Sequence, residues 1–272
     1  LTGFGHFSTA SGFLLLFLLA AILRFVSAGL LAQMAELPLS PSPDSDFTFL
    51  MFLQRIRESN FVRFVLYTAS ITLAAHVAAP YFSVYMLRDL QWSYLRYMSV
   101  HLAAVLAGLV AFPLWGRHAD VVGNAQILKI TGFLTPWIPF LWLVSDSPFY
   151  LAAVELFAGF VWGGFTLCAT NFIYDAVSPK KRVRCLGYFN LINGAAIFVG
   201  SLAGGFLADR LPPLGGHSLL TLFVLSGLLR LGACVLLSSR FQEVRQSARR
   251  VSSRRLFFSV LGFRPLVGPN TE

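Results

Sequence analysis

The 272-residue chain is strongly apolar, with 56% hydrophobic residues, a mean hydropathy of +0.70 and a net charge of +9. Long apolar runs at this density exclude a soluble globular protein and indicate a membrane protein with several spans. The three cysteines, Cys168, Cys185 and Cys234, show no paired spacing. Neither a disulfide framework nor a metal site is therefore predicted.

Seven runs are long and apolar enough to cross a membrane, which takes about 20 residues as a helix. The loops after the second run are short, so we expect consecutive helices to be antiparallel neighbours. The prediction is an all-α, polytopic membrane bundle of seven transmembrane helices. In chain order the runs are Thr9–Met34, Phe61–Leu87, Tyr94–Trp115, Ala125–Ser145, Pro148–Tyr174, Val183–Ala208 and Ser218–Leu237.

Basic residues gather on one side of this predicted bundle. The loops of that side and the C-terminal tail hold most of the arginines and lysines, whereas only Arg88, Arg96 and Arg210 lie on the opposite side. The positive-inside rule then places the N-terminus outside and the C-terminus in the cytoplasm. Membrane topology accounts for the positive charge, so no nucleic-acid partner is predicted.

The first and last runs share a pattern that indicates duplication. Leu16–Arg24 aligns without gaps on Leu222–Arg230, with an arginine at the same position of both runs. A charge at this depth costs at least ~2.5 kcal/mol, so its repetition is informative. We interpret residues 1–34 as the last helix of a preceding six-helix unit, and residues 61–239 as a complete six-helix unit.

Two segments outside the runs complete the predicted organisation. Residues 35–60 contain prolines, serines and acidic residues, followed by a short amphipathic stretch over Phe47–Arg57. This composition predicts a cytoplasmic linker whose second part lies on the membrane surface. Residues 240–272 form a basic cytoplasmic tail, which is either bound to the anionic membrane surface or disordered.

A short polar loop, Trp115–Asn124, separates the third and fourth runs on the predicted cytoplasmic side. It holds Gly116 and Gly123 near its ends and Asp120 between them. Glycine permits a tight turn, and an aspartate can cap a helix N-terminus. We expect Asp120 to cap and hydrogen-bond the loop backbone against the adjoining helix.

The segment Gly116–Gly123 resembles the loop signature of the major facilitator superfamily: a glycine, three residues, an aspartate, two residues and a second glycine. In that family the signature joins the second and third helices of each six-helix half. Here it has that place within residues 61–239. The basic positions of the signature are occupied by Val121 and by Asn124-Ala125. This departure weakens a gating role for the loop and resembles the second-half copy of the signature.

The resemblance implies a secondary active transporter that moves a small solute by alternating access. The chain is then the C-terminal half with the last helix of the N-terminal half, and the N-terminal six-helix half is an expected partner. A proton is a candidate coupling ion, and no cofactor is expected. The segment Arg57–Phe64 is similar to bacterial members, which implies a bacterial inner (plasma) membrane.

Glu155 is the leading candidate for a substrate or proton site. It lies about 10 Å into the membrane from Pro148 at the helical rise per residue. Trp162 and Thr166 follow on the same face of the predicted helix. Intramembrane carboxyl groups usually face the bundle interior or a water-filled cavity. The alternative is a packing role in which Glu155 pairs with His101 or Arg96.

Further polar residues fall within the apolar runs. Thr72 and His76 share a helix face, and His76 and His101 are candidates for proton coupling, with a packing histidine as the favoured alternative. Asn190 and Asn193 either bind substrate or join neighbouring helices, with packing slightly favoured. Arg24 and Arg230 are expected to be structural, either snorkelling to the inner interface or pairing with a loop acid.

Two other functional classes remain open for this pattern. A seven-helix receptor or sensor matches the helix number and orientation, although no lysine for a retinal Schiff base occurs in Ser218–Leu237. An intramembrane enzyme is disfavoured, because the chain has no His-Glu-x-x-His and no Gly-x-Ser-x-Gly motif. No Walker phosphate-binding loop is present either, so ATP-driven transport is not expected. The chain is predicted not to be an enzyme.

Overall fold

The computed structural model describes residues 9–34 and 59–245, and these residues form helices and no strand. The chain divides into two compact units, residues 1–45 and 46–272. The first unit contains one helix, α1 (Thr9–Ala32), which we describe by itself. The second unit contains α3 (Asn60–His76), α4 (Ala79–Val84), the π-helix η3 (Tyr85–Asp89), α5 (Tyr94–Val122), α6 (Asn124–Leu134), α7 (Trp137–Leu141), α8 (Pro148–Ala176), α9 (Pro179–Ala208) and α10 (Ser218–Leu237).

The predicted all-α membrane bundle is confirmed, with one difference in the helix count. Within residues 9–34 and 59–245, six helices are long and apolar enough to cross a membrane. The fourth predicted run, Ala125–Ser145, is not among them, because it is divided at Thr135 and Pro136 into α6 and α7. Proline has no amide hydrogen and its ring clashes with the preceding turn, so Pro136 and Pro139 interrupt the helix within this run.

The first span of the second unit is also interrupted. Residues 60–89 form one candidate span, yet α3 ends at His76 and α4 begins at Ala79, with Pro80 in its first turn. The span then continues into η3. Ser59 starts α3 by accepting a hydrogen bond from the amide of Val62. Interrupted helices expose carbonyl groups to side chains and cavities, which is how they contribute to membrane transport sites.

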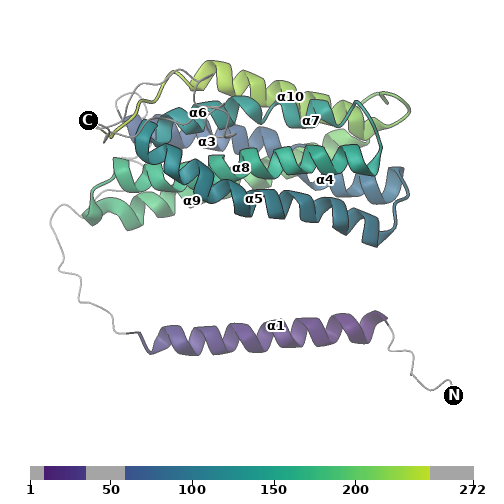
Figure 1. Ribbon diagram of the computed structural model, residues 1–272, viewed down its shortest axis with the longest axis horizontal. Coiled ribbons are helices and arrows are strands. Elements are labelled where there is room, and N and C mark those ends of the chain that lie inside the picture. The colour runs from purple at the N-terminus through teal and green to yellow at the C-terminus, as the bar shows by residue number, and fades with distance from the viewer. Residues whose placement is uncertain (1–8, 35–58, 246–272) are drawn as a thin grey trace, which may run out of the picture. The chain divides into compact units, whose positions relative to one another are not determined.

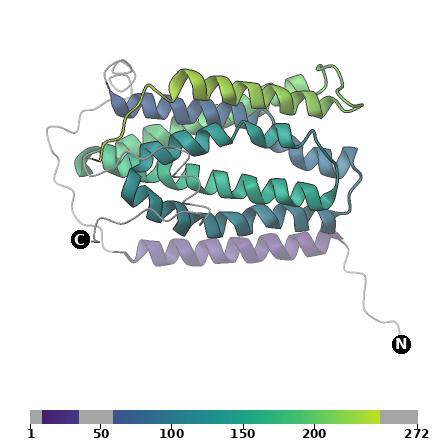
Figure 2. The ribbon, with the colours of Figure 1, turned by 45° about the horizontal axis from the view of Figure 1, so that its top comes forward.

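The helices of the second unit run side by side as a bundle (Figures 1 and 2). Two pairs that are distant in sequence pack through small residues, α5 with α8 and α3 with α9. A side chain at Gly159 would overlap with the backbone of Ala104, and one at Gly204 would overlap with the carbonyl of Val77. Glycine therefore lets the backbones of each pair approach closely, as in other membrane helix pairs.

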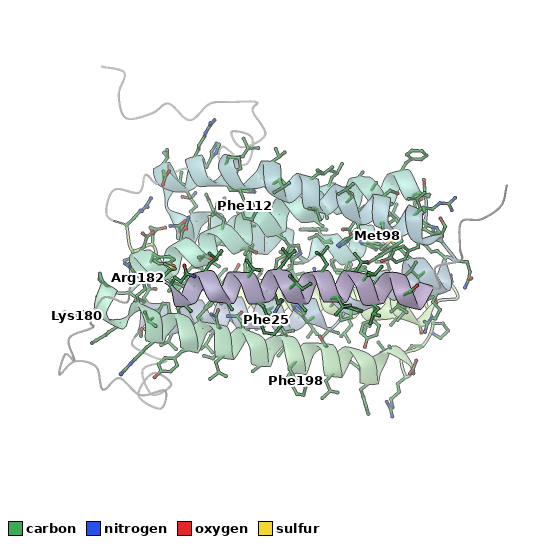
Figure 3. The ribbon with its side chains drawn as sticks, turned by 90° about the horizontal axis from the view of Figure 1, so that it is seen from below. Phe25, Met98, Phe112, Lys180, Arg182 and Phe198 are labelled. Atoms are coloured by element: carbon green, nitrogen blue, oxygen red, sulfur yellow. The ribbon has the colours of Figure 1, made fainter. Side chains whose placement is uncertain are left out.

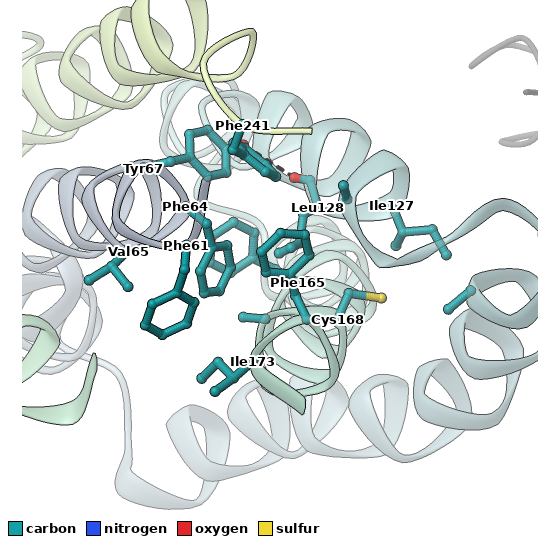
Figure 4. Close-up of a cluster of buried hydrophobic side chains, with 14 of the residues drawn as sticks. Phe61, Phe64, Val65, Tyr67, Ile127, Leu128, Phe165, Cys168, Ile173 and Phe241 are labelled. Carbon is teal, nitrogen blue, oxygen red and sulfur yellow. Dashed lines mark hydrogen bonds between the residues drawn. The ribbon is translucent and has the colours of Figure 1, made fainter. Parts of the chain in front are cut away.

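An aromatic core fills the end of the bundle where α10 finishes (Figure 4). The rings of Phe64 and Phe172 lie 4.4 Å apart, and those of Tyr67 and Phe241 lie 5.0 Å apart. The Tyr67 hydroxyl donates to the carbonyl of Leu128 at 3.2 Å. Phe241 is fully buried although it follows α10. Residues 240–245, the start of the predicted tail, thus pack against the bundle, whereas residues 246–272 lie outside the described residues.

The turn between α5 and α6 differs from the predicted loop in two respects. The α5 helix continues through Gly116 to Val122, so the turn is the single residue Gly123, with φ 87° and ψ 159°. The expected cap is also wrong: the Glu243 carboxylate, and not Asp120, accepts the amide hydrogen of Ala125 at 2.7 Å. A cap can come from a distant segment because it requires only an acceptor near the orphan amides.

Apolar side chains project outward from α5 and α9. Met98, Phe112 and Phe198 point away from the bundle, and Lys180 and Arg182 lie at the start of α9 (Figure 3). Few residues of α5 and α9 are buried compared with α3. Such apolar surfaces are unfavourable in water and suit lipid or another helical unit.

Candidate functional site

A cavity of about 430 Å³ lies among the helices of the second unit. Its wall combines the interrupted span α3–α4–η3 with α5 and α8, and α7 and α10 add one residue each. The polar and charged side chains that line it are His76, Ser83, Tyr97, His101, Glu155 and Arg230. Most of the remaining lining is apolar or aromatic. A concave apolar site with a few polar groups is the usual form of a small-molecule site.

The packing of α5 against α8 brings the two sides of this cavity together. Gly159 lines the cavity and lies directly against the backbone of α5 at Ala104. Gly163, one turn further along α8, lies close to Ala111. The close approach places Glu155 on α8 and His101 on α5 in the same cavity. Side chains from two distant segments therefore share one site.

Glu155 is half-buried in the cavity wall. No hydrogen bond or ion pair of Glu155 is found within residues 9–34 and 59–245. Arg96, one of its two expected packing partners, instead lies over the Trp92 ring at 6.0 Å. His101, the other, stacks on the ring of Tyr97 at 6.0 Å. The described contacts thus do not support the packing alternative, and the carboxyl group faces a cavity.

Both candidate histidines line the cavity, but they are held differently. The Nδ1 atom of His76 lies 2.8 Å from the carbonyl oxygen of Thr72, one turn earlier in α3. This bond makes Nδ1 the protonated nitrogen and leaves Nε2 as the free acceptor. His101 is exposed and contacts Tyr97 through its ring face. Among the described residues, each histidine retains a ring nitrogen that can bind a ligand.

Aromatic rings form much of the remaining wall. Phe82, Tyr97 and Trp162 come from three different elements, α4, α5 and α8. Phe82 packs on Phe223 with centroids 4.3 Å apart, and Trp162 packs edge-on against Phe165 at 5.5 Å. These contacts hold the rings in place. Aromatic faces bind both apolar groups and organic cations, so the wall suits a solute with an apolar body.

Arg230 is placed differently from the expectation. It neither snorkels to an interface nor pairs with a loop acid, because its side chain is 2% exposed within the bundle. Its Nη1 donates to the carbonyl of Thr135 at 3.0 Å and its Nη2 to the carbonyl of Ala75 at 3.4 Å. The backbone carbonyls freed at interrupted helices were not visible in the sequence as acceptors, which explains the error.

A comparison with family models identifies the fold. The model of the Major Facilitator Superfamily matches residues 61–270. The chain belongs to the major facilitator superfamily. The resemblance seen in the sequence is therefore confirmed, and the protein is an integral, multi-pass membrane transporter of the major facilitator type. Neither a curated protein nor a solved structure matches the chain.

Four of the predicted site residues of this major facilitator protein lie away from the cavity. Thr72 on α3 donates to the side-chain oxygen of Asn193 on α9 at 3.1 Å, so this pair joins two helices. Asn193 also donates to the carbonyl of Phe189. Asn190 and Thr166 are exposed on α9 and α8 and do not line the cavity. Helical spacing placed Thr166 near Trp162, but the two side chains point to different surroundings.

Several cavity residues of this transporter were not among the predicted site residues. Tyr97 lies one turn before His101 in α5, and this spacing was available in the sequence. Phe82 and Met86 follow the interruption at Pro80, and Arg230 comes from α10, where it was expected to be structural. No group of three potential metal-ligating side chains occurs in the described parts of the chain.

The family loop signature takes part in a polar network at the cytoplasmic end predicted from the charge pattern. Asp120, with 76% of its side chain exposed, lies 3.2 Å from Arg245, which also approaches Asp175 at 3.4 Å. Asp175 accepts a hydrogen bond from Asn124 at 2.7 Å. The signature residues thus contact the segment after α10. Gly116 lies inside α5, where its role is to pack near Leu167.

Proposed function

We propose that this protein is a secondary active transporter that moves a small solute by alternating access, with the cavity around Glu155 as its solute and proton site. The observation that carries the proposal is a carboxyl group that has no polar partner among the described residues and lies in a cavity lined by aromatic rings and two histidines. Ionisable groups are expensive inside a membrane, and those facing cavities commonly mark ion or substrate pathways. Family membership supports transport and offers nothing in favour of a seven-helix receptor.

Two kinds of ligand can bind the carboxyl group of Glu155. A proton can occupy Glu155, which makes proton coupling the simplest energy source, and His76 lines the same cavity. A cationic group of the solute can instead take the place of the proton. In both cases the aromatic wall contacts the apolar part of the solute.

The cavity is proposed to be one wall of a larger translocation path. The face of α5 that carries His101 and its exposed apolar neighbours is open for a second six-helix unit. The shared pattern of Leu16–Arg24 and Leu222–Arg230 supports such a duplicated unit. The basic residues support an outside N-terminus and a cytoplasmic C-terminus. The similarity of Arg57–Phe64 to bacterial members of the family supports a bacterial plasma membrane.

The Glu155→Gln substitution tests the proposal. It keeps the shape of the side chain but removes its charge and its titration. In cells that express the protein, a panel of radiolabelled solutes first identifies one that accumulates. Uptake of that solute by the variant is expected to fall about tenfold or more, because a charge-assisted contact is lost, and the remaining uptake is expected to lose its pH dependence.

A matched control replaces a carboxyl group that does not line the cavity. Asp209→Asn, at the exposed end of α9, is expected to leave uptake and its pH dependence unchanged. Membrane levels of both variants are compared by immunoblotting. Equal uptake by the Glu155→Gln variant and the parent protein across the pH range would remove Glu155 from the mechanism.

A further inference from the structure

The buried face of α10 carries three polar side chains in a single row. Ser226, Arg230 and Cys234 are four residues apart, and their exposed fractions are 0%, 2% and 2%. This spacing places them on the same side of the helix. Each of the three donates to the backbone of another helix: Ser226 to Ala74 at 2.6 Å, Arg230 to Ala75 and Thr135, and Cys234 to Gly132 at 2.9 Å.

The acceptors on the α6–α7 side are carbonyls that lost their helical donors. In an α-helix each carbonyl accepts from the amide four residues later. Pro136 stands four residues after Gly132, and Pro139 stands four residues after Thr135. Neither proline has an amide hydrogen. Groups three residues later donate to these carbonyls instead: the Thr135 hydroxyl to Gly132 at 2.8 Å and the Ile138 amide to Thr135 at 3.3 Å. Cys234 and Arg230 each add a second donor to one of the two carbonyls.

The acceptors on the other side lie at the interruption between α3 and α4. Here the amide of Ala78 donates to the carbonyl of Ala75, three residues back. The amide of Ala78 therefore does not donate to Ala74, its usual acceptor four residues back. The Ser226 hydroxyl donates to the carbonyl of Ala74 instead. Arg230 reaches Ala75 with Nη2 while its Nη1 remains on Thr135. One guanidinium group thus joins both interruptions.

Both interruptions form part of the cavity wall. Ala75, His76 and Ala79 line the cavity from the first, and Ile138 lines it from the second. The Arg230 side chain is bonded to both of these parts of the wall. Arginine suits this task, because its planar fork holds several donors in fixed directions.

We propose that Arg230 is a positioning residue that holds the two interrupted helices at a fixed spacing and so sets the shape of the cavity. Ser226 and Cys234 each secure one of the interruptions. This role does not depend on the identity of the solute. It also explains why a charge is kept at a buried position of α10, where the Nε atom finds no partner among the described residues.

Hydrogen exchange of the purified full-length protein, read by mass spectrometry, tests the proposal. Arg230→Met removes both donors, and exchange is expected to be about tenfold faster in residues 76–84 and 136–142 because each interruption loses a bond. The matched control, Arg210→Met, removes an exposed arginine that follows α9 and donates to the carbonyl of Phe206 in that helix at 2.8 Å. This control is expected to leave both segments unchanged.

Two milder variants keep the test valid where Arg230→Met does not fold. Ser226→Ala is expected to accelerate exchange only at the α3–α4 interruption, and Cys234→Ala only at the α6–α7 interruption. Unchanged exchange at both interruptions in Arg230→Met, or an equal increase in every helix, would overturn the proposal. For the milder variants, no change or the same change at both interruptions would overturn it.

A second readout reports on the cavity itself. Ser83 lines the cavity on α4, and the three native cysteines are buried, so a Ser83→Cys substitution offers a distinct thiol to N-ethylmaleimide. In combination with Arg230→Met its labelling is expected to be about threefold faster or more, because α4 is released. Labelling at Ser147→Cys, in the exposed turn before α8, is expected to stay the same. Equal labelling rates for the Ser83→Cys protein and for the same protein that also carries Arg230→Met would contradict a positioning role.

Discussion

Gly123 forms the turn between α5 and α6 with a backbone conformation that other residues rarely adopt. Its φ of 87° and ψ of 159° fall in a region used almost only by glycine. The Glu243 carboxylate occupies the space where a side chain at this position would lie. Here Glu243 caps α6, and its other oxygen accepts from the amides of Val244 and Arg245. One glycine thus permits both the turn and the cap.

We predict that Gly123→Ala lowers the free energy of unfolding by about 1–3 kcal/mol, because it strains the backbone and displaces Glu243. Thermal unfolding of the purified protein followed by circular dichroism measures this loss. The control is Gly187→Ala, in the interior of α9 with open space around it, which is expected to be neutral or slightly stabilising. Equal melting temperatures for the two variants would contradict this account of the turn.

At the level of elements, close helix pairs and interrupted helices have different origins. The α5–α8 and α3–α9 pairs depend on glycines that meet the partner backbone, whereas the interruptions depend on prolines and on donors from α10. The α3–α9 pair is further joined by Thr72 and Asn193. Backbone contact between α3 and α9 leaves no room for a larger residue at the contact points.

We predict that Gly204→Ala loosens the α3–α9 pair, since the added methyl group would overlap with the carbonyl of Val77. Overpacking of this kind costs about 1–3 kcal/mol. Gly194→Ala is a matched control in the same helix, where no atom lies within 4 Å of the added group. Unfolding in increasing concentrations of a denaturing detergent should show a lower midpoint for Gly204→Ala than for Gly194→Ala. A Gly194→Ala variant as unstable as Gly204→Ala would show that the contact with Val77 is not the cause of the loss, because alanine by itself favours the helix.

At the level of the whole molecule, the second unit has a chemically distinct segment at each end of the bundle. The end with α10's C-terminus contains the aromatic core, Phe241 and the network of Asp120, Arg245 and Asp175. The opposite end contains Tyr85 donating to Asp146 at 2.8 Å and the ion pair of Arg88 with Asp89. The basic residues concentrate at the first end, which predicts that it faces the cytoplasm.

Labelling from each side of the membrane tests this orientation. A cysteine introduced as Asp209→Cys, in the exposed end of α9, is expected to react with an impermeant maleimide in intact cells. A cysteine introduced as Ser239→Cys, in the exposed segment after α10, is expected to react only in inverted membrane vesicles. The reverse pattern would show that the basic residues do not determine the orientation.

The sequence by itself determined the class of this protein, its spans and its family. Apolar runs of spanning length must be helical in a membrane, because the backbone has no water to bond with. Polar residues inside the apolar runs singled out Glu155, His76 and His101, and helical spacing from Glu155 added Trp162. All four line the cavity. Such features depend on local composition, which is fully present in the amino-acid order.

Only the tertiary structure decided which polar groups meet. Arg230 bonds to carbonyls that lie 95 and 155 residues away in the chain. Glu243 caps a helix that begins 119 residues earlier, at Asn124. Thr72 donates a hydrogen bond to Asn193. Arg230 donates to backbone carbonyls, and Glu243 accepts from a backbone amide. A backbone group has the same chemistry in every residue but proline. No residue type therefore marks the partner in advance. The packing of the helices brings each donor to its acceptor and thereby decides which groups form hydrogen bonds.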